Sequence, residues 1–297
     1  MATIAEWVEG ARPRTLPAAV SPVLAGSATA LVALGRFESR HVVVAALCAV
    51  IALALQIGVN FANDHSDGVR GTDDERIGPM RLVGSGAATP STVKAAAFTC
   101  FGIAAVAGLV AVWMTGLWWL LAVGAAAILA AWFYTGGRHP YGYLGLGEVF
   151  VFIFFGLVAV AGTHLLLTRS TSIAAWMLAV AIGLIACLIL VANNLRDIEG
   201  DTASGKRTLA TRIGDPGSRT LFMVMARFTL FFVVIAAATS HPWLLLGMVG
   251  GIPLMLANAT VSRGATGREL IGVLKLTGIA ELLVGLGVLF GAVLAVA

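Results

Sequence analysis

Long apolar runs are the feature of this 297-residue sequence that most restricts its fold. An apolar helix of about 20 residues crosses the ~30 Å hydrocarbon core of a bilayer. Nine runs of about that length occur, at residues 15–34, 42–62, 93–113, 117–135, 147–167, 173–193, 219–239, 243–261 and 271–295. Because lipid offers the backbone no hydrogen-bond partner, such runs must be helical. The sequence predicts an all-α membrane bundle of nine transmembrane helices, a single domain covering residues 1–297.

The distribution of lysine and arginine predicts an orientation for this bundle. Fifteen of the 19 cations fall in loops at one end and three at the other, while Arg227 lies within a span. Cytoplasmic loops are the ones enriched in these residues. We therefore expect a cell-membrane protein with a cytoplasmic N-terminus, an outer C-terminus and a retained first span in place of a cleaved signal peptide. The net charge of +4 comes from scattered loop cations, which argues against a nucleic-acid partner.

Two polar stretches follow the second and the sixth predicted spans, at residues 60–81 and 193–207. If they continue those spans as helices, each places one asparagine and two aspartates on a single helix face. The six residues are Asn60, Asp64 and Asp67 in the first stretch and Asn193, Asp197 and Asp201 in the second. The offset of four spans favours an internal repeat, spans one to four and five to eight with a ninth added. The two polar faces would then meet in a central cavity open to the cytoplasm.

The side chains of these stretches suit a metal ion and a diphosphate. Mg²⁺ prefers oxygen ligands and is usually held by one or two carboxylates together with substrate phosphates. Arginine and lysine beside each polar face would neutralise phosphate oxygens. These cations are Arg70, Arg81, Lys206 and Arg207. A lipid diphosphate is the substrate that needs such a site in a membrane, because metal and cations stabilise the charge of the leaving diphosphate.

A third segment, residues 134–148, is rich in glycine and aromatic residues. One interpretation is a tight loop between helices in which the glycines form turns. The other is an aromatic-walled mouth for a planar acceptor, with Tyr134, Tyr141 and Glu148 as candidate contacts. In that interpretation either Glu148 or Tyr141 lies near the acceptor's polar groups.

These three segments resemble the UbiA superfamily of intramembrane prenyltransferases, whose two aspartate-rich motifs follow the second and sixth of nine helices. The resemblance rests on residues 63–81, 134–148 and 193–210 and covers essentially the whole chain. The most similar branch is that of the 1,4-dihydroxy-2-naphthoate polyprenyltransferases of menaquinone synthesis. It implies Mg²⁺-dependent transfer of a polyprenyl group from polyprenyl diphosphate to this aromatic acid, whose carboxylate leaves as CO₂.

The same resemblance implies roles for individual residues. Four aspartates would bind Mg²⁺, and the two asparagines would support the diphosphate. The aspartates are Asp64, Asp67, Asp197 and Asp201, and the asparagines are Asn60 and Asn193. In one place the sequence departs from the family pattern, because Gly71 stands where a third aspartate is usual. The next acids are Asp73 and Asp74, and which of them is used stays open.

Three alternatives differ in substrate or in class. Another acceptor, such as 4-hydroxybenzoate, is compatible with the same superfamily. An alcohol phosphotransferase using a CDP-linked lipid also has metal-binding aspartates, but in one continuous motif. A Mg²⁺ transporter should carry acids along a path through the membrane, whereas these lie at one face. The roles of Arg227 and Glu281 within spans stay open, and the three cysteines have no disulfide or zinc-ligand spacing.

Overall fold

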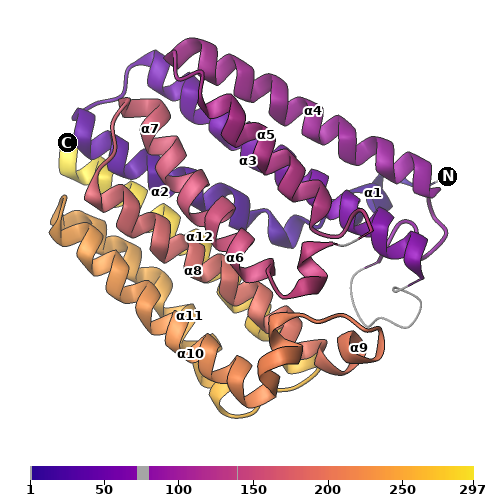
Figure 1. The fold of residues 1–297 in the computed structure, drawn as a ribbon. Coiled ribbons are helices and arrows are strands. Elements are labelled where there is room, and N and C mark those ends of the chain that lie inside the picture. The colour runs from indigo at the N-terminus through magenta and orange to yellow at the C-terminus, as the bar shows by residue number, and fades with distance from the viewer. Residues whose placement is uncertain (1, 72–79, 139) are drawn as a thin grey trace.

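The computed structural model describes residues 2–71, 80–138 and 140–297. Every regular element within them is a helix, and the long helices run alongside one another in one bundle (Figure 1). The first part of the chain contains α1 (Ile4–Gly10), η1 (Pro13–Thr15), α2 (Pro17–Leu34), α3 (Ser39–Arg70), α4 (Pro90–Thr115) and α5 (Leu120–Phe133). The second part contains η2 (Tyr141–Leu144), α6 (Gly147–Val151), η3 (Phe152–Ala161), α7 (Gly162–Thr168), α8 (Ile173–Arg196), α9 (Ile198–Ala203), α10 (Leu209–Ala238), η4 (Pro242–Gly250), α11 (Gly251–Ser262) and α12 (Arg268–Val296). The predicted all-α class is confirmed.

Within the described residues, eight helical stretches are long and apolar enough to cross a bilayer. The remaining predicted span, residues 117–135, contains α5, whose 14 residues extend about 21 Å. The two termini lie at opposite ends of the bundle (Figure 1), which requires an odd number of end-to-end passages, so α5 makes one of them. Because α5 is shorter than a typical hydrocarbon core, nine full crossings stay a prediction.

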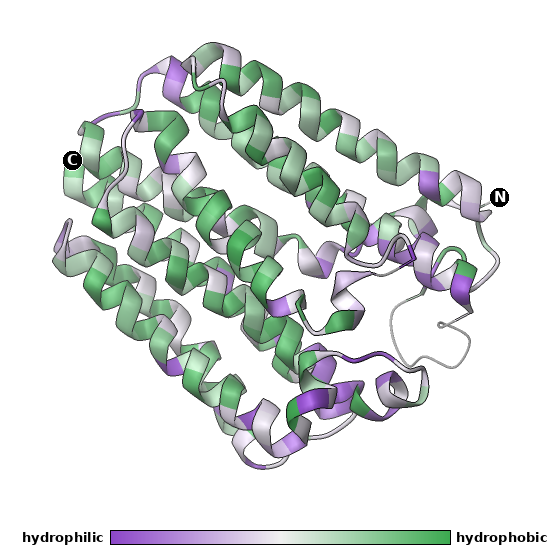
Figure 2. Cartoon of the chain, viewed as in Figure 1, coloured by the Kyte–Doolittle hydropathy of each residue, from purple (hydrophilic) through white to green (hydrophobic). Residues whose placement is uncertain are grey.

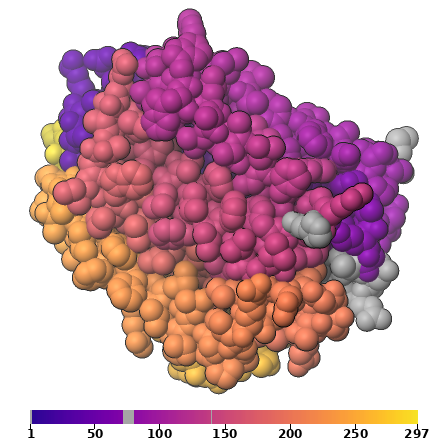
Figure 3. Space-filling view, in the orientation of Figure 1, coloured from indigo at the N-terminus to yellow at the C-terminus, as the bar shows by residue number. Residues whose placement is uncertain are grey.

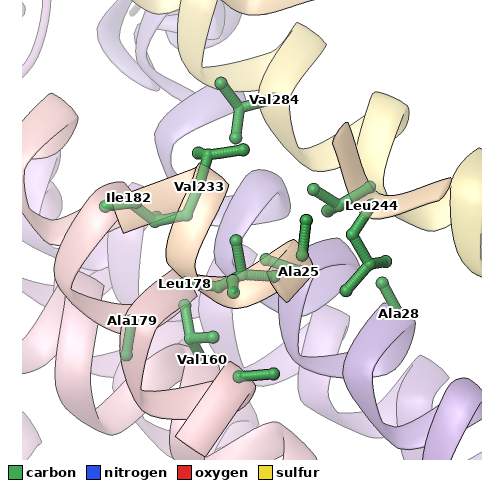
Figure 4. Close-up of a cluster of buried hydrophobic side chains, with 14 of the residues drawn as sticks. Ala25, Ala28, Val160, Leu178, Ala179, Ile182, Val233, Leu244 and Val284 are labelled. Carbon is green, nitrogen blue, oxygen red and sulfur yellow. The ribbon is translucent and has the colours of Figure 1, made fainter. Parts of the chain in front are cut away.

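Small residues allow the central helices to approach closely. Figure 4 shows one buried cluster in which alanines of α2 and α8 lie among larger side chains of η3, α10, η4 and α12. At Gly156 of η3, an added Cβ would lie 2.6 Å from the carbonyl oxygen of Ala179 and 2.6 Å from the Cα of Gly183, both in α8. Helices in lipid associate largely through such close packing, which gives a reason for glycine at these two positions.

Residues 60–70 of the first polar stretch form the end of an unusually long helix. The 32 residues of α3 extend about 48 Å, which exceeds the ~30 Å hydrocarbon core. Its last turns therefore carry polar residues to the edge of the membrane, and Figure 2 shows hydrophilic positions concentrated at this end of the bundle. The helix stops at Gly71, whose φ of 70° is left-handed. Glycine adopts this conformation without strain, which gives a structural reason for the departure from the family pattern.

The second polar stretch is helical as far as Ala203, with one interruption, and residues 204–207 follow without helix. α8 ends at Arg196 and α9 begins at Ile198, so the expected continuous helix is broken at Asp197. Backbone bonds still cross the break, from the N–H of Asp197 to the carbonyl of Asn193 (3.1 Å) and from the N–H of Asp201 to that of Asp197 (2.8 Å). Asn193, Asp197 and Asp201 therefore remain one helical turn apart along the backbone, although the helix axis is interrupted between the first and the last of them.

The third segment, residues 134–148, leads into the helices of residues 147–168. Residues 140–170 together cover one face of the molecule between the N-terminal helices and α10 (Figure 3, pink between purple and orange). At its start the short η2 turns the chain into α6, and α6 continues into the π-helix η3. This arrangement brings η2 and α6 to the end of the bundle where α3 and α9 also lie (Figure 1).

Candidate active site

Asp64 lies on the buried face of α3 and holds the chain segment that follows the helix. Its Oδ2 accepts the N–H of Leu82 at 2.7 Å, and its Oδ1 accepts the N–H of Val83 at 3.0 Å. The residue is 1% exposed. Because each carboxylate oxygen has a second lone pair, these bonds leave Asp64 able to bind a metal while it fixes the backbone beside it.

Asn60 connects the same helix to the N-terminal segment. Its side-chain amide donates to the carbonyl of Ala11 at 2.9 Å and to the hydroxyl of Thr15 at 3.0 Å. Its oxygen accepts a longer bond of 3.4 Å from the Gln56 amide. Both amide hydrogens are therefore engaged within the protein. The predicted contact of Asn60 with diphosphate would require one of these bonds to break.

Asp67 faces the third segment. Its Oδ1 accepts the hydroxyl of Tyr143 at 2.6 Å, and its Oδ2 lies 3.6 Å from the guanidinium of Arg81. The side chains of Asp67 and Arg81 are 7% and 10% exposed. A nearly buried carboxylate with a cation and a hydroxyl on its two oxygens has a fixed orientation. The structure thus brings together two of the residues predicted to act on the metal and the diphosphate.

Arg70 holds the loop that follows α5. Its guanidinium donates to the carbonyl of Thr135 and, at 2.5 Å, to that of Gly137. The hydroxyl of Thr135 in turn donates to the side chain of Asn63 at 2.8 Å. Two of the five donors of this guanidinium, which the sequence assigned to diphosphate, therefore bind backbone carbonyls that were not anticipated as partners. The guanidinium carbon also lies 5.4 Å from the centre of the Tyr143 ring.

The second polar stretch carries its own ion pairs. Arg196 binds Asp197 bidentately, with both N–O distances 2.7 Å. The Nζ of Lys206 lies 3.9 Å from a carboxylate oxygen of Asp201 and 4.7 Å from the centre of the Tyr143 ring. The backbone N–H of Arg207 donates to the carbonyl of Tyr143 at 3.0 Å. The second stretch thus meets the first at this tyrosine.

Tyr134 directly follows α5 and contacts later residues of the third segment. Its backbone carbonyl accepts the N–H of Gly142 at 3.0 Å. A Cβ added at Gly147 in α6 would lie 3.4 Å from its hydroxyl oxygen. The phenol of this predicted acceptor residue therefore lies beside the start of α6, which carries Glu148.

The other predicted acceptor residues form a wall beside this phenol. Tyr141 stacks on Phe150 with ring centres 4.0 Å apart and meets the Tyr134 ring edge to face at 5.5 Å. Its hydroxyl donates to the carbonyl of Ala130 at 2.8 Å. Glu148, which is buried, accepts the side-chain amide of Asn194 at 3.0 Å. A carboxylate oriented by an amide therefore lies next to an aromatic surface.

Comparison with known proteins identifies this arrangement. Residues 19–269 match the UbiA prenyltransferase family. The chain belongs to this family. It is 47% identical, over 97% of each chain, to the 1,4-dihydroxy-2-naphthoate octaprenyltransferase of Mycobacterium tuberculosis. The predicted superfamily, the prenyltransferase class and the multi-pass membrane character are thereby confirmed.

Solved structures agree with this UbiA fold. A UbiA homologue from Aeropyrum pernix superposes with a TM-score of 0.69 at 15% identity, over 93% of this chain and 97% of that one. A UbiA homologue from Archaeoglobus fulgidus, bound to GPP and Mg²⁺, gives a TM-score of 0.67 at 10% identity over 96% and 99%. At these identities the likeness establishes the fold alone.

The donor set of this UbiA-family site fits Mg²⁺ in chemistry. All four predicted ligands are carboxylates, and a hard cation of this kind prefers oxygen. In the part of the chain that the structure describes, no three His, Cys, Asp or Glu side chains are gathered as a ready-made metal site. Asp73 and Asp74 lie outside the described residues. An ion bound by one or two carboxylates and completed by phosphate oxygens needs no such ready-made cluster.

Sequence reasoning missed three contributors to the site. Tyr143, Asn194 and the segment around Leu82 all contact predicted site residues, and none was assigned a role. The adjacent pair Asn193–Asn194 could have indicated the contact with Glu148. Neighbouring residues of a helix lie on different faces, so Asn194 was available for a partner other than the acidic face. No sequence pattern pointed to Leu82, since its contribution is a backbone N–H.

Proposed function

We propose that this UbiA-family enzyme transfers a polyprenyl group from polyprenyl diphosphate to 1,4-dihydroxy-2-naphthoate, with Mg²⁺, in menaquinone biosynthesis. One observation carries the proposal: the segment 141–148 touches both acidic stretches. Its Tyr143 bonds Asp67 of the first, and its Glu148 bonds Asn194 of the second. A site for a diphosphate and a site for an aromatic acid are therefore adjacent. The relative in M. tuberculosis, which is named for this reaction with an octaprenyl chain, supports the choice of acceptor.

The acidic stretches form the diphosphate half of the site. Mg²⁺ would be held by the four aspartates Asp64, Asp67, Asp197 and Asp201. The ion, when bound, stabilises negative charge on the diphosphate as the bond from oxygen to the allylic carbon breaks. Lys206, Arg207 and Arg81 add positive charge beside it, and Asn193 adds amide donors. The bonding electron pair leaves with the diphosphate, and an allylic carbocation remains against the aromatic wall.

The segment from Tyr134 to Glu148 forms the acceptor half. Tyr141 contributes its ring only, because its hydroxyl is bonded to a backbone carbonyl and burial raises its pKa. Glu148 is then the group that accepts a proton from an acceptor hydroxyl. Electron density from that oxygen moves into the ring, whose carboxyl-bearing carbon bonds the carbocation. The resulting β-keto acid loses CO₂, and the electron pair of the broken bond moves to the ketone oxygen. Glu148 returns its proton to that oxygen, which regenerates the aromatic diol, so atoms and charge balance without a further cofactor.

The orientation in the membrane belongs to the same proposal. The fifteen cations assigned to one side include those of both acidic stretches. The positive-inside rule then places the site and the N-terminus in the cytoplasm and the C-terminus outside, in the cell membrane. Polyprenyl diphosphate would enter with its tail in lipid and its diphosphate at the cytoplasmic edge.

Acceptor labelled with ¹³C in its carboxyl group tests this function. Purified enzyme supplied with Mg²⁺, octaprenyl diphosphate and labelled 1,4-dihydroxy-2-naphthoate should release one labelled CO₂ for each diphosphate formed. Mass spectrometry of the product and of the gas measures both. A parallel reaction with labelled 4-hydroxybenzoate serves as the control, since its prenylation leaves the carboxyl group in place.

Two outcomes would contradict the proposal in different ways. A prenylated naphthoate that retains its label would refute the decarboxylating step. Turnover with 4-hydroxybenzoate alone would refute the acceptor while leaving the prenyltransferase assignment intact.

A further inference from the structure

Tyr143 occupies an unusual position for a loop aromatic residue. Its hydroxyl donates to Asp67 of α3, while Arg70 and Lys206 both lie over its ring, at 5.4 and 4.7 Å. Its backbone carbonyl accepts the N–H of Arg207. One half-buried residue thus contacts a predicted metal ligand and three predicted diphosphate residues, two from each acidic stretch.

The turn around Tyr143 is itself fixed. The N–H of Gly142 bonds the carbonyl of Tyr134 at 3.0 Å, and a Cβ at residue 142 would lie 2.7 Å from that same oxygen. Gly145 ends the turn at φ 74°, where a Cβ would lie 3.0 Å from the carbonyl of Arg207. Both glycines therefore permit close approaches that place the tyrosine between α3 and the segment after α9.

We propose that Tyr143 is the positioning residue for the Mg²⁺–diphosphate complex. Its hydroxyl sets the rotamer of Asp67, one of the residues that would hold the metal. Partners behind a metal ligand usually change metal affinity by about 10–100-fold when they are removed. Its ring attracts the Arg70 and Lys206 cations from the two acidic stretches, which holds them at a common point. The proposal rests on the diphosphate half of the proposed function and not on the identity of the acceptor.

A neighbouring tyrosine shows that this contact is specific. Tyr141 lies in the same turn, but its hydroxyl ends on the backbone carbonyl of Ala130. That bond anchors a loop, whereas the bond from Tyr143 reaches a carboxylate that was assigned to the metal. The two hydroxyls can therefore be removed separately. Loss of the Tyr143 hydroxyl should weaken binding of Mg²⁺ and diphosphate, whereas loss of the Tyr141 hydroxyl should remove only a bond to the backbone.

Binding of inorganic diphosphate with Mg²⁺, measured without prenyl substrate or acceptor, tests this role. Thermal unfolding of the purified full-length enzyme in detergent should show stabilisation that saturates with diphosphate at fixed Mg²⁺. Tyr143→Phe keeps the ring and removes the hydroxyl, so the half-saturating concentration should rise about tenfold. Tyr143→Leu removes the ring as well and should raise it several-fold further. Tyr141→Phe, the matched control, should keep the wild-type half-saturating concentration.

Steady-state kinetics supply a second readout. In Tyr143→Phe the Mg²⁺ concentration for half-maximal rate should rise by the same factor, while the acceptor KM stays at its wild-type value. A wild-type or lower half-saturating concentration in Tyr143→Phe would overturn the role of Tyr143. The diphosphate site itself would stand in that case, because the wild-type enzyme would still bind diphosphate. No stabilisation of the wild-type enzyme at any Mg²⁺ concentration would overturn the diphosphate site itself, and the role of Tyr143 with it.

Discussion

Asp64 and Asp67, one helical turn apart in α3, make different contacts. Asp64 accepts two backbone N–H groups and so fixes the fold of residues 82–83. Asp67 instead accepts a tyrosine hydroxyl and lies beside an arginine. A sequence motif treats the two as equivalent ligands. Their contacts differ: Asp64 bonds backbone N–H groups of the segment after α3, and Asp67 meets side chains of that segment and of η2.

Replacing Asp64 or Asp201 by asparagine should separate stability from activity. Under the proposed function both aspartates hold the ion that stabilises the leaving diphosphate, so turnover should fall about a hundredfold or more in each variant. Asp64→Asn also turns an acceptor into a donor facing a buried N–H, at a cost of about 1–3 kcal/mol. Asp201→Asn keeps the shape of the side chain and weakens an ion pair whose 3.9 Å separation is already long. Thermal unfolding in detergent should therefore show a larger fall in Tm for Asp64→Asn than for Asp201→Asn.

The outcome that contradicts this assignment is specific. If Asp64→Asn unfolds at the wild-type temperature, the two backbone bonds contribute nothing measurable. If either variant keeps the wild-type rate at all Mg²⁺ concentrations, that aspartate has no part in the chemistry.

At the scale of elements, the contact between η3 and α8 depends on a pair of glycines. Gly156 and Gly183 face each other, and a Cβ on either would lie within 3.0 Å of the other's Cα. The packing of these two helices also positions α6, whose Glu148 reaches Asn194 at the end of α8. A change at Gly156 should therefore reach the acceptor half of the site.

Gly156→Ala should destabilise the enzyme by about 1–3 kcal/mol, because the added methyl overpacks a contact made by backbone atoms. Gly102→Ala in α4 is the matched control, since its Cβ would meet nothing within 4 Å. Its Tm should equal or exceed the wild-type value, because alanine favours a helix over glycine. The Tm of both variants in the same detergent measures the difference. Equal Tm values for the two variants would show that the contact between η3 and α8 accommodates the added methyl group without a loss of stability.

How far sequence reasoning reached differs between the elements. Asn60, Asp64 and Asp67 were predicted on one face of α3, and all three are buried on that helix, because the apolar span dictates its continuation. The break at Asp197 and the left-handed Gly71 were not predicted, since both depend on local backbone conformation. The proposed internal repeat stays a prediction. Contacts through backbone groups, such as the carbonyl partners of Arg70, leave no trace in side-chain patterns.

At the scale of the whole molecule, the termini lie at opposite ends of the bundle (Figure 1). Residue 170, in the loop before α8, and residue 203, in α9, flank α8, which is long and apolar enough to cross a bilayer. The two residues should therefore lie on different sides of the membrane. Single cysteines introduced there, with Cys48, Cys100 and Cys187 replaced by alanine, test the orientation. In sealed cells an impermeant thiol reagent should label position 170 from outside and position 203 only after permeabilisation. The reverse pattern would invert the proposed topology.

The fold class and membrane character followed from the sequence because the bilayer leaves few solutions for an apolar chain. The exact number of crossings did not follow, since the run at residues 117–135 spends several residues in turns before α5 begins. The convergence of the two stretches was expected from their repeated pattern. The residue through which they meet, Tyr143, became visible only in three dimensions.

The hydrogen bonds from Arg70 to the carbonyls of Thr135 and Gly137 couple two parts of the site. The helix end that carries Asp67 and the loop that leads to Tyr141 are held by one guanidinium, so neither shifts alone. A ligand that reorders either part changes the free energy of binding at the other. By linkage, any increase in diphosphate affinity caused by the acceptor must equal the increase in acceptor affinity caused by diphosphate. The two substrates of this enzyme are thus expected to bind cooperatively.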